Sequence, residues 1–196
     1  MQFFYDNINN YSDNDYQKMY NNLSITDKNK TDKLLKNVSK KQSILSKYLL
    51  RSILSQKYHL DYNNIYYSKF NKPLIKEINF NISHSFNYVV LIFSEKEIGI
   101  DIEKIRKVNL NIINSFCTDR EKAYILNSND IYKSLFEIYT LKEAYFKMLG
   151  TNLFNIKNIE FNIDKNTITS SISNLNIKLN YDISGYIIAI IEKVGN

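Results

Sequence analysis

The sequence is poor in the residues and segments that mark secreted and membrane-spanning proteins. Its single cysteine, Cys117, excludes an internal disulfide and favours a reducing compartment. No apolar stretch approaches the roughly 20 residues of a membrane span, and Met1–Asp6 show no basic region followed by an apolar run, so we expect no signal peptide. These absences predict a cytoplasmic protein in which Cys117 is a buried structural thiol rather than a nucleophile.

Tryptophan is absent, and proline and glycine are scarce, but the overall composition is that of a folded domain. The 196 residues are 44% hydrophobic and 23% charged, which is ordinary for a soluble protein with a sizeable core. The formal net charge of +6 is compatible with three kinds of partner: nucleic acid, a phosphorylated small molecule or an acidic protein. The lysines are spread along the chain, which is a weak pattern for a nucleic-acid groove.

The stretch Glu97–Glu103 is the most informative one. Its alternation predicts a strand with Asp101 and Glu103 on one face and Ile100 and Ile102 on the other. Adjacent carboxylates repel each other unless a cation lies between them, and Mg²⁺ prefers such oxygen ligands. Gly99 would allow another backbone or a ligand to come close. The alternative is the solvent-facing side of an amphipathic strand, which a lone Asp-x-Glu more often represents.

The order of predicted elements is α+β. Before the acidic strand we expect a strand over 1–10, a short helix over 15–23, a long helix over 38–58, and strands over 80–83 and 88–93. The acidic strand should pair with 88–93 as a hairpin through the turn at 94–97. Helical segments over 109–129, a helix over 130–149 ended by Gly150, and strands over 156–163, 167–179 and 185–192 should follow.

An internal echo indicates two similar halves. The apolar run 185–193 repeats the character of 87–96, and each follows a long helix by a few tens of residues. The sequence thus predicts two pseudo-symmetric α/β halves, 1–96 and 97–196, each a small antiparallel sheet packed with a long helix. The cleft between such halves is a natural ligand site.

A second set of charged residues lies on the helix predicted over 130–149. A helical wheel places Glu143 and Lys147 one turn apart and nearly opposite the core positions, which are Ile138, Leu141, Tyr145, Met148 and Leu149. Alone, such a pair is most often an exposed i,i+4 ion pair. Together with Asp101 and Glu103 it suits a metal-bridged pyrophosphate, because the metal neutralises oxygens while lysine takes up leaving-group charge.

These motifs, in this order and spacing, resemble those of the 4′-phosphopantetheinyl transferase superfamily, in its larger monomeric type that activates peptide synthetases. The resemblance covers most of residues 20–150, and beyond that only the strand pattern agrees. The matching motifs are Lys72-Pro73, Phe80-Asn81-Ile82-Ser83-His84-Ser85, Gly99-Ile100-Asp101-Ile102-Glu103 and Lys142-Glu143-Ala144-x-x-Lys147, with Leu50-Arg51-Ser52 before them.

The resemblance implies transfer of 4′-phosphopantetheine from coenzyme A to a serine of an apo carrier protein, with release of adenosine 3′,5′-bisphosphate. It implies Mg²⁺, with Mn²⁺ as a substitute, held by Asp101, Glu103 and Glu143. Glu143 is also the candidate base, although a metal-bound water remains an alternative. Lys147 would neutralise the leaving group, and Lys142 would support the catalytic site.

The resemblance also implies a coenzyme A pocket on the side of residues 1–96. Its expected members are Lys28, Lys30, Ser43, Lys72, Ser83, His84 and Lys147. Gln42 stands where the family usually has a basic residue, and Asp27 stands near a common lysine position. We therefore expect that Gln42→Arg would sharpen discrimination between coenzyme A and its 3′-dephospho form.

The expected partners are coenzyme A and acidic acyl or peptidyl carrier domains, with no nucleic acid, no membrane and a monomeric enzyme. Two other functions compete with this interpretation. A nucleic-acid-binding module would need aromatic residues interleaved with Lys and Arg on an exposed face. An inactive scaffold of the same fold would be expected to have lost an acid or a lysine of the motifs, yet all five are present. The sequence leaves open whether the carrier serves fatty-acid, polyketide or peptide synthesis.

Overall fold

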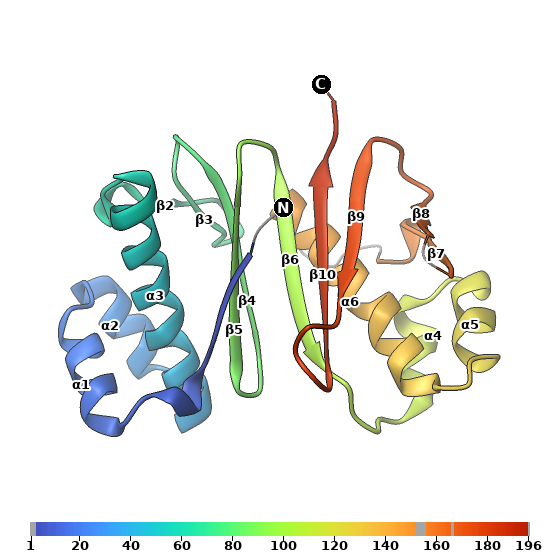
Figure 1. Ribbon diagram of the computed structural model, residues 1–196, viewed down its shortest axis with the longest axis horizontal. Coiled ribbons are helices and arrows are strands. Elements are labelled where there is room, and N and C mark those ends of the chain that lie inside the picture. The colour runs from blue at the N-terminus through green and yellow to red at the C-terminus, as the bar shows by residue number, and fades with distance from the viewer. Residues whose placement is uncertain (1–2, 152–155, 166, 196) are drawn as a thin grey trace.

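Two three-stranded antiparallel sheets form the centre of the protein. The computed structural model describes residues 3–151, 156–165 and 167–195. The first sheet has the order β1 (Phe3–Asn7), β5 (Tyr88–Ser94) and β4 (Asn79–Ser85), and the second has the order β6 (Ile98–Lys104), β10 (Tyr186–Lys193) and β9 (Leu175–Asn180). The two sheets lie between α1–α3 on one side and α4–α6 on the other (Figure 1). This arrangement confirms the predicted α+β fold.

The helices fall into two groups, one for each sheet. The first group is α1 (Asp13–Asn21), α2 (Ile25–Asp32) and α3 (Asn37–Tyr58), and the second is α4 (Ile113–Phe116), α5 (Asp119–Leu126) and α6 (Ile131–Leu149). Two short hairpins are also present: β2 (Tyr66–Tyr67) with β3 (Pro73–Leu74), and β7 (Phe161–Asp164) with β8 (Thr167–Ser170). Short 3₁₀ helices lie at Ile8–Asn10, Tyr62–Asn64, Leu110–Ile112 and Ile156–Asn158. None of the described helices has the length and apolar character needed to span a bilayer.

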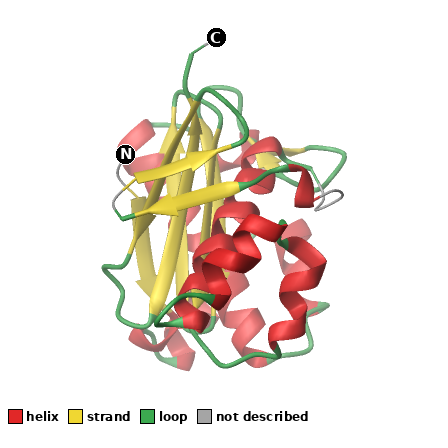
Figure 2. Ribbon diagram, turned by 90° about the vertical axis from the view of Figure 1, so that its right-hand side faces the viewer, coloured by secondary structure: helices red, strands yellow, loops and turns green. Residues whose placement is uncertain are grey.

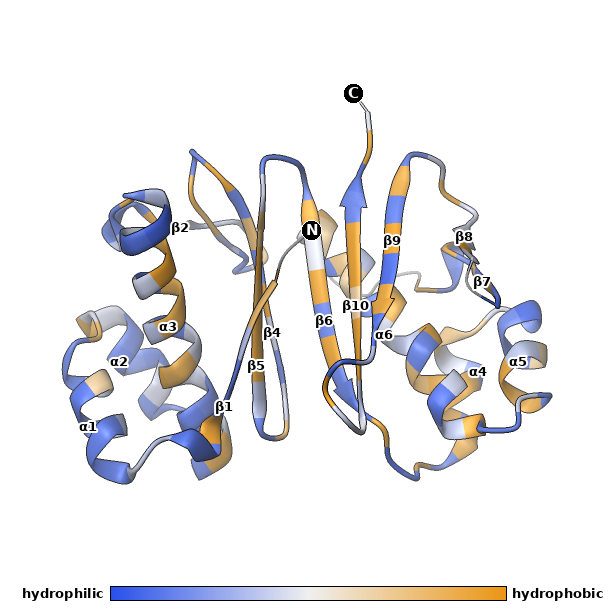
Figure 3. Cartoon of the chain, in the orientation of Figure 1, coloured by the Kyte–Doolittle hydropathy of each residue, from blue (hydrophilic) through white to orange (hydrophobic). Residues whose placement is uncertain are grey.

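Hydrophobic packing connects each long helix to its own sheet and the two sheets to each other. Leu45, Leu50 and Leu54 of α3 pack with Val89 and Leu91 on the outer face of β5. The opposite face of β5 joins residues of β6 and β10 in a separate cluster between the sheets, which includes Val90, Ile92, Ile100, Ile102, Ile188 and Ile190. Figure 3 shows the hydrophobic residues concentrated on the strands, whereas α1 and α2 are largely hydrophilic.

The repeated apolar segments occupy equivalent places in the two sheets. β5 and β10 are each the central strand of their sheet. Both begin with a tyrosine, and the rings of Tyr88 and Tyr186 meet edge to face with centroids 5.0 Å apart. The internal echo in the sequence therefore corresponds to two structurally similar sheets, as expected.

Most helix and strand positions agree with the sequence-based predictions, but four details differ. The acidic strand β6 pairs with β10 rather than with β5, so the expected hairpin is wrong. The lysine-rich segment before α3 contains a helix of its own, α2, which Ser24 caps by accepting from the Asp27 amide. Leu149 is 45% exposed rather than part of the core face, and the segment predicted as one strand over 167–179 is divided between β8 and β9.

Gly99 explains how α6 comes so close to the acidic strand. A Cβ atom at this position would lie 2.0 Å from the carbonyl oxygen of Ala144 and 2.6 Å from the amide nitrogen of Met148. Any side chain would therefore push the helix away. The close approach expected at Gly99 is that of the α6 backbone, and it brings the charged residues of the helix to the edge of β6.

Candidate active site

Side chains of β4 bridge the two sheets where their neighbouring edge strands meet. Asn81, Ser83 and Ser85 each accept a hydrogen bond from a backbone amide of β6, at Ile100 (3.1 Å), Ile102 (3.4 Å) and Lys104 (3.3 Å) respectively. Every second residue of β4 thus contacts the β6 backbone through its side chain, where paired strands would use backbone hydrogen bonds. This polar seam fixes the position of β4 relative to the acidic residues of β6.

Asp101 lies at the centre of a charged cluster on this seam. Its Oδ1 atom accepts from the Ser83 hydroxyl at 2.7 Å and from the Lys147 ammonium at 2.6 Å. The same ammonium lies 2.7 Å from the Ser83 oxygen. The Asp101 side chain is only 5% exposed, whereas that of Lys147 is 31% exposed. Three elements, β4, β6 and α6, therefore meet in one hydrogen-bonded group.

Two further carboxylates stand beside Asp101. Ser85 donates to Glu103 at 3.0 Å, and Arg106 lies 3.3 Å from the same oxygen. Burial, and then repulsion from Asp101, raise the pKa of Glu103. Burial also raises the pKa of Glu143, with a further contribution from Asp101. The charge of Asp101 thus disfavours the charged forms of both glutamates, and a bound cation would relieve this repulsion.

The donor set fits a divalent cation. Asp101 Oδ2 is the one buried side-chain polar atom of the described residues without a hydrogen-bond partner. Carboxylate oxygens are the preferred ligands of Mg²⁺, which usually binds proteins through one or two of them and keeps several waters. Within the described ranges no three His, Cys, Asp or Glu side chains lie close enough together to hold a metal ion as a group. The residues therefore offer oxygen ligands rather than a closed site.

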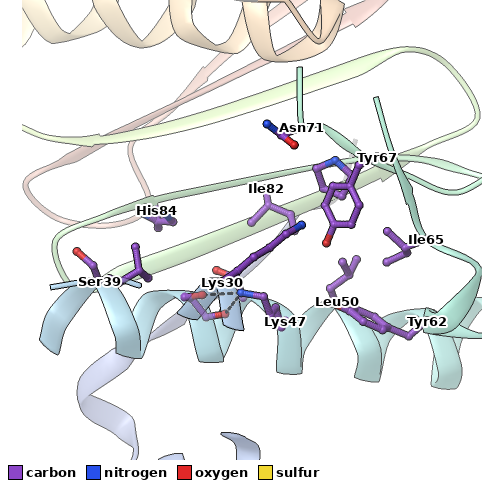
Figure 4. A pocket seen from close by; sticks show the side chains of 14 residues that line it. Lys30, Ser39, Lys47, Leu50, Tyr62, Ile65, Tyr67, Asn71, Ile82 and His84 are labelled. Atoms are coloured by element: carbon purple, nitrogen blue, oxygen red, sulfur yellow. Dashed lines mark hydrogen bonds between the residues drawn. The ribbon is translucent and has the colours of Figure 1, made fainter. Parts of the chain in front are cut away.

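A pocket of about 690 Å³ opens on the other side of β4, between that strand, α3 and the β2–β3 hairpin (Figure 4). Its size is within the usual range for small-molecule sites. Three of the residues expected to bind coenzyme A line this pocket: Lys30, Ser43 and His84. Lys30 extends from α2 until its ammonium lies 3.4 Å from the centre of the Tyr67 ring. Basic and aromatic side chains thus enclose the pocket.

Strand alternation separates two residues that we expected to act together. Ser83 points into the acidic cluster, where it contacts Asp101 and Lys147, whereas its neighbours Ile82 and His84 line the pocket. The surrounding protein lowers the pKa of His84, and Lys147 lowers it further by charge repulsion. The structure thus places Ser83 in the acidic cluster and His84 in the pocket, on opposite faces of β4.

Lys47 was missed by the sequence analysis, which did not include it among the expected pocket residues. It lines the pocket (Figure 4), and its ammonium lies 2.5 Å from the Ser43 hydroxyl and 3.3 Å from Thr31 Oγ1. Lys47 stands one helical turn after Ser43, so both residues project from one face of α3. That i,i+4 spacing with a predicted pocket residue is the signal that could have identified it.

Several predicted site residues lie elsewhere. Lys28 donates to the Asn21 carbonyl at 2.9 Å, and Lys72 donates to the Met148 carbonyl at the end of α6 at 2.8 Å. Gln42 is 5% exposed and donates to the Phe86 carbonyl at 2.7 Å, in the β4–β5 turn. None of the three lines the pocket. The expected role of Gln42 beside the 3′-phosphate is therefore not supported.

Lys142 also lies outside the cluster, although it is five residues from Lys147. It is fully buried and forms an ion pair of 2.7 Å with Glu121, which is buried as well. Its ammonium also donates to the carbonyl oxygens of Phe116, Ile156 and Ile159. Lys142 therefore holds α4, α5 and α6 together and does not reach the site. Asp27 is likewise buried, with hydroxyl donors from Ser24 and Tyr62.

Comparisons with known proteins identify the family of this chain. Residues 97–191 match the family model of the 4′-phosphopantetheinyl transferase superfamily, and residues 10–96 match the model of the 4′-phosphopantetheinyl transferase N-terminal region. The two matches adjoin at the connection between β5 and β6. The chain belongs to the 4′-phosphopantetheinyl transferase superfamily.

Particular relatives have the same description. The chain is 34% identical to 4′-phosphopantetheinyl transferase gsp of Aneurinibacillus migulanus over 70% of its own length and 60% of the relative's. It is 32% identical to 4′-phosphopantetheinyl transferase Sfp of Bacillus subtilis over 57% and 53%. The chain thus spans somewhat more than half the length of these relatives. A solved structure, the holo-[acyl-carrier-protein] synthase of Thermotoga maritima, aligns with a TM-score of 0.45 and 20% identity, covering 51% of this chain and 64% of that one.

Proposed function

We propose that this protein transfers the 4′-phosphopantetheine group of coenzyme A to a serine hydroxyl of an apo carrier protein. The observation that carries the proposal is the placement of two sites on adjacent residues of β4. His84 lines a pocket that contains Lys30, and Ser83 contacts Asp101 and Lys147. A ligand with phosphates at two separated positions suits this pair of sites. Coenzyme A has a 3′-phosphate and a pyrophosphate, and the family match points to the same ligand.

In the proposed reaction the carrier serine oxygen attacks the β-phosphate of coenzyme A. A bond forms between that oxygen and phosphorus while the bond to the bridging pyrophosphate oxygen breaks. The products are holo-carrier and adenosine 3′,5′-bisphosphate. Glu143, half-buried on α6, is the candidate to accept the serine proton. Lys147 is the cation nearest to Asp101 and would neutralise charge on the leaving phosphate.

A divalent cation belongs to this proposal. Asp101, Glu103 and Glu143 would hold Mg²⁺, or Mn²⁺ in its place, and the ion when bound would neutralise pyrophosphate oxygens. The unpartnered Asp101 Oδ2 and the repulsion of Asp101 on Glu103 and on Glu143 support this assignment. Ser83 and Ser85 would orient Asp101 and Glu103, because each hydroxyl donates to one of these carboxylates.

The partner we propose is an acidic acyl or peptidyl carrier domain that meets a monomeric enzyme in the cytoplasm. The formal net charge of +6 would steer an acidic carrier towards this protein. The single buried thiol, Cys117, suits a reducing compartment.

Intact mass spectrometry of candidate carriers tests the proposal. Apo carriers from fatty-acid, polyketide and peptide-synthetase systems would each be incubated with the protein, coenzyme A and Mg²⁺. At least one carrier should gain the mass of a single phosphopantetheine group, and the same carrier with its acceptor serine changed to alanine should gain none. If every carrier keeps its apo mass while a known transferase converts it under the same conditions, the proposed function is wrong.

A further inference from the structure

Lys47 stands out among the lysines of α3 because it enters the pocket without an anionic partner. Its side chain is half-buried, and its ammonium contacts the hydroxyls of Ser43 and Thr31. Throughout the described part of the chain, no carboxylate lies within ion-pair distance of Lys47 or of Lys30. The pocket thus holds two cations and no anion that pairs with either.

Asp27, the acidic residue whose charge influences Lys47, does not neutralise it directly. The carboxylate of Asp27 accepts from the hydroxyls of Ser24 (2.8 Å) and Tyr62 (3.0 Å), and the residue is 2% exposed. It supplies background negative charge behind the pocket. The ammonium of Lys47 therefore stays available on the pocket side.

The surroundings of Lys47 disfavour its positive charge. Burial lowers the pKa of Lys47, and repulsion from Lys30 adds to this effect, while Asp27 opposes it. An anion placed near both ammonium groups would offset the cost of burying the Lys47 charge and would also reduce its repulsion from Lys30. A phosphate monoester, which carries close to two negative charges at neutral pH, matches two lysines better than a singly charged anion does.

We propose that Lys47, together with Lys30 and the Ser43 hydroxyl, binds the 3′-phosphate of coenzyme A. This inference rests on the proposed function and adds to it a residue that distinguishes coenzyme A from its 3′-dephospho form. The position of Gln42 strengthens the inference, because that side chain is held at the β4–β5 turn by the Phe86 carbonyl. Lys47 enters the pocket from the same helix and supplies the positive charge that Gln42 lacks.

The test compares the binding of two ligands by calorimetry, with matched lysine variants. Lys47→Met should weaken coenzyme A binding by about tenfold or more, since hydrogen bonds to charged groups contribute about 1.5–3 kcal/mol. Its affinity for 3′-dephospho-coenzyme A should change by less than about twofold on the same argument. Lys57→Met is the control, because Lys57 is exposed on the same helix and contacts the Phe4 and Tyr58 rings. It removes the same charge and should affect neither ligand.

Three results would overturn the assignment of Lys47. One is an unchanged affinity for coenzyme A in Lys47→Met, and another is equal weakening for both ligands. The third comes from the wild-type protein, so it does not depend on the folding of a variant: coenzyme A should protect Lys47 from acetylation, whereas the 3′-dephospho form should not. Equal protection by the two ligands would contradict the proposal.

The failure of this inference is separable from failure of the proposed function. If wild-type protein binds coenzyme A and modifies a carrier while Lys47→Met behaves like Lys57→Met, only the role of Lys47 is lost. If wild-type protein neither binds coenzyme A nor modifies any carrier, the proposed function is wrong and the role of Lys47 is wrong with it.

Discussion

The two sides of β4 differ in whether their charged side chains have partners. On the side of His84, Lys30 and Lys47 face a pocket without an ion-pair partner among the described residues. On the side of Ser83, the carboxylates of Asp101 and Glu103 are already held by hydroxyl and cationic donors. The pocket is therefore prepared for an anion, whereas the acidic cluster is ordered around its own charges.

This difference teaches how one strand can serve two tasks. Successive residues of a strand point to opposite faces, so the Ser83–His84 pair reaches both sites without any loop rearrangement. We infer that the pocket contributes mainly to ligand affinity, and that the acidic cluster contributes mainly to the chemical step. Variants on the two sides should then separate binding from transfer.

Asp101→Ala should produce the largest separation. Removing it takes away the partner of Lys147 and one of the three proposed metal ligands, so transfer should fall by about a thousandfold. Coenzyme A affinity should change little, because the pocket residues are untouched. The measurements are the transfer rate by carrier mass, and calorimetric binding without metal.

Asp164→Ala is the matched control for this variant, because Asp164 is an exposed residue of β7, outside both sites. It should keep the wild-type transfer rate. Near wild-type transfer by Asp101→Ala in Mg²⁺ would show that the acidic cluster is not the centre of the reaction.

Lys142→Met and Lys147→Met should separate a structural lysine from a functional one. Removing Lys142 leaves Glu121 buried without its partner, a change that costs about 3–5 kcal/mol of unfolding free energy. For a chain of this size, the melting temperature should fall by roughly 6–20 °C. Lys147 is partly exposed, so its removal should lower the transfer rate with a much smaller thermal effect. Equal melting temperatures for the two variants would contradict this distinction.

Gln42→Arg should destabilise the protein rather than improve ligand discrimination. The change removes the hydrogen bond to the Phe86 carbonyl and brings a charge into a position that is 5% exposed in the wild type. Losing a hydrogen bond at a buried group costs about 1–3 kcal/mol. The ratio of affinities for coenzyme A and 3′-dephospho-coenzyme A should stay at its wild-type value. A sharper ratio would mean that residue 42 does reach the ligand, as the sequence alone predicted.

The smallest expected effect is the contribution of the Cys117 thiol to the pH dependence of stability, which appears only at alkaline pH. Burial raises the pKa of this thiol to about 12, from an ordinary value of 9.0. The folded protein therefore keeps a proton that the unfolded chain releases above pH 9, so stability is lost as the pH rises from about 9 towards 12. At pH 8 the folded protein should react with iodoacetamide far more slowly than the urea-unfolded chain. Equal rates would show that Cys117 is accessible.

Much of the fold could be predicted because local patterns determine it. Alternation predicts β6, apolar runs predict β5 and β10, and helical spacing together with the terminal Gly150 predicts α6. Pairing partners could not be predicted in the same way. β6 follows β5 in the chain, but it pairs with β10, which begins more than 80 residues later. Local sequence patterns do not specify a pairing over such a distance.

The site was predictable at the level of residue type, and its division between two faces was not. The charged motifs identify Asp101, Glu103, Glu143 and Lys147, yet the pattern does not reveal that Lys142 turns into a buried ion pair. That difference depends on Glu121, which reaches Lys142 only through tertiary packing. Lys47 is the opposite case. Its sequence position is typical of an exposed charge on a helix, but β4 and the β2–β3 hairpin enclose it in the fold.

Titration of coenzyme A into the metal-free wild-type protein tests the division between the two sides of β4 most directly. A prepared cationic pocket predicts saturable binding at one site without Mg²⁺, competed by adenosine 3′,5′-bisphosphate, while carrier modification still requires the metal. If coenzyme A shows no saturable binding until Mg²⁺ is added, the pocket does not hold the ligand by itself, and the proposed division of tasks is contradicted.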